Sequence, residues 1–342
     1  MPTAGALPPT PTPTPSPKPT PGSFLTTAGP ATTIVGEYLL TGGRLLVKFT
    51  RPRHTGWAIV LPGAQVGQEP LTLGGEVRDT LTIRPPEPST GAEAAVAAQQ
   101  LSASGWTQDV QLALLELVGH GTPPATAIQQ VEPQRSSAAA AGDPNPDGDY
   151  FENGCAYDQL DDNGVSARGC YRRYWGYEDE DDKYAGATSW AYAGIDENPG
   201  QSTVLTIVTT AHTYSNATMR QYDPLGTISQ GSCSTIGLGI SAYGVNVSQS
   251  QPVCPEKLQP TIYEDGTVYG VDWRGRTSSG SRHTELVEVA HTTKVYYYPA
   301  PNPSYFGFAY HMDFRATAYC VEYDCLGDPS RTPKDIIQDV LH

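Results

Sequence analysis

The chain has few charged side chains for its length, and basic ones are the scarcest. Charged residues make up 17 % of its 342 residues, with 21 Lys and Arg against 36 Asp and Glu, so the formal net charge is −15. Nucleic acid is therefore disfavoured as a partner, because neutralising phosphates requires clustered Lys and Arg. The acidic balance suits solubility, cation binding or a basic partner instead.

A secretory leader and a long apolar run are also absent. Residues 1–5 carry neither a basic n-region nor the start of an apolar h-region. No run approaches the ~18 apolar residues of a membrane-spanning helix, so we expect no transmembrane segment. We expect that a leader or lipoprotein anchor has been removed and that Met1 is not the native start. The alternatives are a cytoplasmic protein with a Pro-rich head and a fragment of a larger secreted chain.

Short catalytic motifs are missing as well. The sequence contains no Gly-x-Ser-x-Gly elbow, no His-Glu-x-x-His, no P-loop and no Cys-x-x-Cys pair. These absences leave no evident catalytic machinery. They do not exclude a β-sandwich hydrolase, since two catalytic carboxylates carry no local signature.

What is present begins with a Pro/Thr-rich segment. Residues 8–22 alternate Pro with Thr, Ser or Lys, which fixes φ and removes backbone donors. We therefore expect residues 1–22 to be an extended spacer of the polyproline type, about 3 Å per residue. Spacers of this kind hold a domain away from a membrane or wall, which predicts an extracellular or surface-tethered protein.

The next segment, residues 23–132, is expected to form a small α+β domain. Short apolar runs between Gly and Pro turns predict strands over residues 23–84. Helical signals follow over residues 91–132, where Thr107 is a suitable N-cap and Gly119 a stop. Residues 133–149 are expected to be a low-complexity linker that marks a domain boundary.

Residues 150–342 are expected to form a disulfide-rich antiparallel β-sandwich with a short C-terminal helix. The 35 Gly and 31 Pro favour sheets and turns. The clearest strand is 306–320, where apolar side chains alternate with a polar face that includes His311 and Asp313. Residues 285–298 are expected to be its neighbour, bringing His291 beside that face. A His/Asp pair would orient a general base or bind a metal, although polar residues belong on such a face in any case.

The cysteines predict disulfides rather than a metal site. All six lie in the second half without zinc-ligand spacing. Among 15 connectivities, we favour the pairs nearest in sequence. These pairs are Cys155–Cys170, Cys233–Cys254 and Cys320–Cys325.

A calcium site is predicted at an acidic loop. Hard cations prefer several oxygen ligands from one tight turn, with Gly at the sixth position. The candidate ligands are Asp143, Asn145, Asp147, Asp149 and Glu152. The loop resembles the first half of the calcium loops of EF-hand, dockerin and thrombospondin type-3 repeats. It departs from the EF-hand pattern at the twelfth position, which is Gly154, and an acidic linker without tight binding is the alternative.

Aromatic side chains complete the functional expectations. Tyr296, Tyr297 and Tyr298 must project to both faces of a strand, and with Trp273 they form a candidate ligand platform. Rings that cover a sheet edge are the alternative. We expect an extracellular or cell-surface binding, adhesion or assembly protein that binds a surface polymer, carbohydrate or protein, or assembles with itself. The alternatives are a secreted hydrolase acting on polysaccharide and a membrane-active β protein of the pore-forming type.

Overall fold

Strands dominate the computed structural model, and the part of the chain that it describes has three helices after the fifth strand. The residues that the structure describes are 32–52, 54–73, 76–84, 91–141, 150–160, 165–177, 183–195, 203–213, 217–223, 228–229, 234–242, 245–253, 257–265, 268–276, 283–295, 310–320 and 336–341. The expected spacer, residues 1–22, lies outside them. The prediction of a mainly antiparallel β protein with some helices is confirmed.

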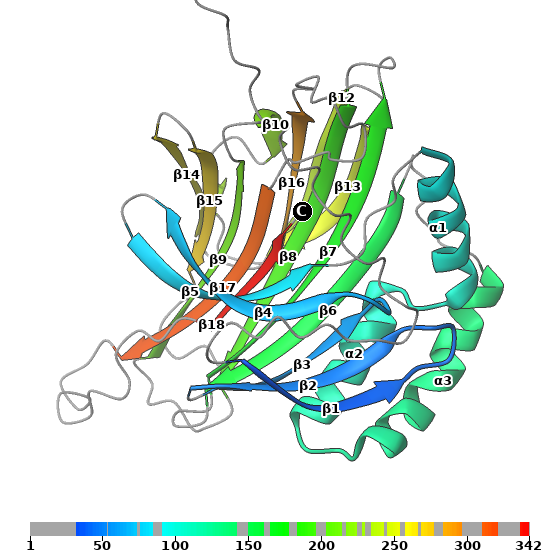
Figure 1. Ribbon diagram of the computed structural model, residues 1–342. Coiled ribbons are helices and arrows are strands. Elements are labelled where there is room, and N and C mark those ends of the chain that lie inside the picture. Colours follow the sequence, from blue (N-terminus) through cyan, green and yellow to red (C-terminus); the bar gives the residue numbers. More distant parts are fainter. Residues whose placement is uncertain are drawn as a thin grey trace, which may run out of the picture.

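Two large sheets contain most of the strands among these described residues (Figure 1). The first sheet has the order β1-β2-β3-β6-β7-β8-β16-β10. Its strands are β1 (Thr33–Leu39), β2 (Leu45–Arg51), β3 (His54–Val60), β6 (Tyr150–Leu160), β7 (Val165–Tyr177), β8 (Lys183–Ile195), β16 (His283–Val295) and β10 (Ala217–Asp223).

The second sheet has the order β11-β14-β15-β9-β17-β18-β5-β4, and all its pairings are antiparallel except that of β18 with β5. Its strands are β11 (Ile228–Ser229), β14 (Lys257–Asp265), β15 (Val268–Arg276), β9 (Thr203–Thr213), β17 (Tyr310–Cys320), β18 (Ile336–Leu341), β5 (Glu76–Arg84) and β4 (Gln65–Leu73). A separate hairpin pairs β12 (Ser234–Ala242) with β13 (Val245–Val253).

Helices α1 (Gly91–Ser104), α2 (Gln108–Gly119) and α3 (Pro124–Ala141) lie on one face of the first sheet (Figure 1). Helix α2 begins where the sequence predicted, because the Thr107 side chain accepts a hydrogen bond from the Val110 amide. A core of buried residues from the helices and from β2, β3, β6 and β7 fills the space between them. Its members include Leu46, Ile59, Trp106, Leu114, Leu115, Val131 and Tyr157.

The opposite face of the same strands packs on β4 and β5. Alternate positions of β2 and β3, such as Val47, Phe49 and Ala58, form a second buried cluster with Val66 and Ile83 of those two strands. Both faces of the first sheet are therefore buried near β2 and β3. A period-2 strand can serve two cores in this way because successive side chains point to opposite faces.

Helix α3 extends into the first part of the segment that was expected to be a linker. Helix α3 continues through residues 133–141, although Pro133 lies inside it. Ala is the strongest helix former, and Ala138 packs against the core beneath the helices. Strand β3 pairs with β6, which follows this segment in the sequence.

Two expectations need correction in the second half of the chain. Residues 336–341 form strand β18 rather than a helix, because their backbone pairs with β17 on one side and β5 on the other. The strand expected over 306–320 is observed from Tyr310, but β16 is not its neighbour. Instead, β17 pairs with β9 and β18, while β16 pairs with β8 and β10 in the other sheet.

Candidate functional site

A buried polar network joins the turn between β1 and β2 to β6 and α2. The Arg44 side chain is 2 % exposed and donates to the main-chain oxygen and to Oδ1 of Asn153, at 2.7 and 2.8 Å. Gln111 Nε2 donates to the same Oδ1 at 2.7 Å and to the Trp106 carbonyl at 2.9 Å. Asn153 Nδ2 also donates to that carbonyl, at 3.2 Å. We call Arg44, Trp106, Gln111 and Asn153 the Arg44 network.

The backbone conformation of the turn that precedes Arg44 requires glycine at two positions. Gly42 and Gly43 have φ of 87° and 89°, a region that L side chains avoid. The turn is closed by hydrogen bonds from Leu40 N to Arg44 O at 2.8 Å and from Gly43 N to Leu40 O at 3.1 Å. The preceding Thr41 carbonyl accepts from Trp106 Nε1 at 2.6 Å. The network therefore fixes one end of the first sheet against the helices.

A separate buried polar cluster, formed by Arg51, His54 and Asp158, lies where β2, β3 and β6 meet. Arg51 Nη2 donates to Asp158 Oδ2, and His54 Nδ1 lies 3.1 Å from the same oxygen. The exposed fractions of the three side chains are 3 % for Arg51 and Asp158 and 14 % for His54. Arg51 Nη2 also lies 3.4 Å from His54 Nδ1, so the three side chains form one connected cluster. These contacts fix the orientation of the His54 imidazole. Because the cluster is buried, its main effect is to link the three strands.

Among the side chains of the first sheet that the structure describes, the exposed large apolar or aromatic ones lie on its terminal strand, β1. Val35, Tyr38 and Leu39 are 52 %, 39 % and 75 % exposed, although all three are large and apolar or aromatic. Behind them, the Tyr38 ring lies 6.2 Å from that of Trp57, and Lys48 Nζ lies 5.4 Å from the centre of the Trp57 ring. We call Val35, Tyr38 and Leu39, with the backbone that carries them, the β1 edge.

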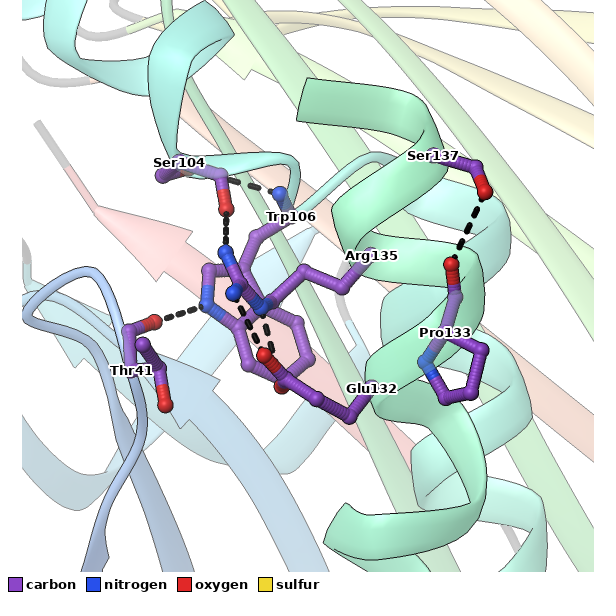
Figure 2. Close-up of polar contacts among 7 residues, drawn as sticks. All are labelled: Thr41, Ser104, Trp106, Glu132, Pro133, Arg135 and Ser137. Carbon is purple, nitrogen blue, oxygen red and sulfur yellow. Dashed lines mark hydrogen bonds and ion pairs between the residues drawn. The ribbon is translucent and has the colours of Figure 1, made fainter. Parts of the chain in front are cut away.

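Figure 2 shows how α3 is attached to the end of α1. Arg135 Nη1 donates to the Ser104 carbonyl at 2.7 Å, while Nε and Nη2 hold both carboxylate oxygens of Glu132 at 3.0 and 2.5 Å. The adjoining Gly105 has φ of 68°, and a Cβ there would lie 2.2 Å from the Arg135 carbonyl oxygen. The hydrogen bond from Arg135 is the main cause that lowers the pKa of Glu132.

This lowered pKa predicts a measurable pH dependence. A carboxyl with a depressed pKa in the folded state contributes stability above its unfolded pKa of about 4.3, and that contribution is lost as pH falls through the folded pKa. We therefore expect the difference in unfolding free energy between the wild type and Glu132→Gln to favour the wild type at pH 6 and to shrink in acid. Urea unfolding of both proteins across this range measures it, and Arg135→Gln should remove the difference. A difference independent of pH would contradict the assignment.

Of the residues predicted to act at sites, the Cys155–Cys170 pair is described in full. The two sulfurs are bonded and the two residues are direct partners in the β6–β7 ladder, with a Cα–Cα distance of 4.1 Å, as expected. Glu152 lies in β6, Trp273 in β15 and Cys320 at the end of β17, where the structure describes their backbone. The other predicted residues lie outside the described part of the chain: Asp143, Asn145, Asp147, Asp149, Cys233, Cys254, Tyr296, Tyr297, Tyr298 and Cys325.

The β1 edge was missed by sequence reasoning. Residues 33–39 contain apolar side chains of the kind that usually fill a core, and nothing local distinguishes an exposed edge strand from an interior strand.

Within the part of the chain whose side chains are described, no group of three His, Cys, Asp or Glu lies together as metal ligands. No helix among the described residues is both long and apolar enough to cross a membrane.

Comparisons with known proteins add little. No protein-family model matches the chain, and no curated protein matches it. Among solved structures, it is similar to the Clostridium perfringens NetB toxin in its membrane-inserted form, at 9 % identity and a TM-score of 0.12. The match covers 52 % of this chain and 85 % of the toxin chain. A likeness of this size carries no argument about fold or function.

Proposed function

We propose that this chain is an extracellular or cell-surface assembly protein whose copies associate through the β1 edge. Its two large sheets then form a β-sandwich scaffold, and residues 1–22 act as the spacer that holds the scaffold away from its point of attachment. The observation that carries the proposal is the exposure of three large apolar or aromatic side chains on one terminal strand. No described contact favours the hydrolase or the pore-forming alternative.

The disulfide supports a location outside the cytoplasm. Cys155 and Cys170 are 1 % and 0 % exposed and lie within the core beneath the helices. A buried cross-strand bond of this kind is structural, and structural disulfides form and persist in oxidising compartments. The Pro/Thr-rich segment and the cysteines of the second half point the same way.

The β1 edge has the properties of a pairing strand. Among the described strands, β1 ends the first sheet and pairs on one side with β2. Proteins usually protect such edges with Lys, Pro or very short strands, since unpaired backbone groups recruit other strands. Residues 33–39 contain neither Lys nor Pro, and Glu37 is their one charge. A bulge between Ile34 and Gly36 leaves the segment after it regular.

A second copy of the chain fits this edge. Antiparallel pairing about Tyr38 puts that ring beside its own copy and sets Glu37 opposite the partner's Leu39. Like charges do not then face each other, and aromatic pairs stabilise such ladders by about 0.2–1 kcal/mol. The net charge of −15 opposes association over longer range, so salt should strengthen it.

We predict that the wild type forms dimers as its concentration rises and that Leu39→Lys weakens this association at least about tenfold, because a charge on an edge strand opposes pairing. Sedimentation velocity over a concentration series at low and high salt measures the effect. Val96→Lys is the matched control, since Val96 is 53 % exposed on α1, away from the edge. A wild type that stays monomeric throughout, or equal effects of both lysines, would refute the proposal.

A further inference from the structure

The second sheet brings together residues that lie far apart in the sequence. His311 of β17 is the direct register partner of His212 on β9. Two residues along β17, Asp313 is the direct partner of Asp339 on β18. The predicted neighbour of this strand supplied His291 instead, and that residue lies in the first sheet.

These four positions share one face of the sheet. Directly paired residues lie on the same face, and so do residues two apart along a strand. Asp339 pairs with Thr82, whereas the next residue, Val340, pairs with Ile83. Ile83 is buried in the cluster shared with the first sheet. His212, His311, Asp313 and Asp339 therefore occupy the face opposite to that core, and we call them the His/Asp group.

The chemistry of the group is that of a divalent transition-metal site. Directly opposed positions have Cβ atoms about 4.5–5.5 Å apart, so each pair places two residues of metal-binding type side by side on the sheet. Two carboxylates balance a divalent charge, and imidazole nitrogen selects Zn²⁺ and similar metals over Ca²⁺, which takes oxygen ligands. We propose that the His/Asp group binds Zn²⁺ or a similar first-row metal ion.

A bound cation also accounts for the Asp313–Asp339 pairing. Like charges set directly opposite each other destabilise a sheet, so the pair weakens β17–β18 unless something compensates it. Arg315 is the competing candidate, because it lies two residues beyond Asp313 on the same face. An ion pair with Arg315 would stabilise the two carboxylates without a metal ion. The two explanations therefore predict different melting temperatures in EDTA when one carboxylate is removed.

The test is Zn²⁺ titration of the full chain by calorimetry, with thermal melting in EDTA and in Zn²⁺. We expect saturation at a single equivalent and a higher melting temperature. His311→Ala and Asp339→Asn should each weaken binding at least about tenfold, as even changes outside the ligand shell can do. His291→Ala on β16 is the matched control and should bind as the wild type does.

Two further measurements keep the proposal falsifiable. Co²⁺ should give d–d absorption in the wild type that His311→Ala abolishes, and excess Ca²⁺ should not displace Zn²⁺. In EDTA, Asp339→Asn should melt at or above the wild-type temperature, because it removes repulsion. Equal Zn²⁺ binding by wild type and His311→Ala would overturn the proposal. A lower melting temperature of Asp339→Asn in EDTA would overturn it as well, by favouring the ion pair.

Discussion

Replacing Asn153 with alanine is expected to lower the free energy of unfolding by about 3–5 kcal/mol, because several buried polar groups each lose a hydrogen-bond partner at about 1–3 kcal/mol per group. The change removes an acceptor for Arg44 and Gln111 and a donor to the Trp106 carbonyl. None of these groups gains water in exchange, because Arg44 and Gln111 are 2 % and 0 % exposed. Urea unfolding followed by circular dichroism measures the loss.

Two comparisons make this prediction specific to the Arg44 network. Gln129→Ala, at an exposed position of α3, should stay within about 0.5 kcal/mol of the wild type. The double variant Arg44→Met/Asn153→Leu should lose less than the sum of its single changes, because it removes the buried cation together with its acceptor. A loss below about 1 kcal/mol for Asn153→Ala would mean that the network contributes little beyond packing.

Removing the disulfide is expected to be the second-largest change. The bond joins residues 15 apart in sequence, and closing a loop of that length restricts the unfolded chain by about 3 kcal/mol. We therefore expect Cys155→Ala/Cys170→Ala to lower the free energy of unfolding by about that amount, without a change of fold. Guanidinium unfolding of the double variant and the wild type, both without reductant, tests it.

Burial of the bond gives an independent check. With both sulfurs in the core beneath the helices, dithiothreitol should reduce this disulfide only when the protein unfolds. Alkylation after dithiothreitol treatment, followed by mass spectrometry, should find the Cys155 and Cys170 peptides unlabelled when the treatment is in native buffer and labelled when it is in guanidinium. Labelling at the same rate in both conditions would contradict a structural role, and with it one support for an extracellular location.

Local physics accounts for the elements that the sequence predicted correctly. The Thr107 cap was predicted because N-capping depends on a side chain within one turn of the helix start, and α2 ends at Gly119 with His120 as its C-cap. The period-2 pattern identified β17, since alternation reports a strand whichever strand lies beside it. Cys155 and Cys170 were paired correctly as neighbours in sequence, which a hairpin makes neighbours in space.

Pairing partners and burial were decided only by the tertiary structure. Arg44 follows two glycines in the sequence, and nothing near it indicates that it is buried. Its hydrogen-bond partner Asn153 lies 109 positions away, and that bond compensates the cost of burying the charge. His212 came to lie beside His311, and β3 beside β6, through connections too long to leave a local signal. Lengthening a loop costs little entropy, so the choice among distant strands depends on how their faces pack together.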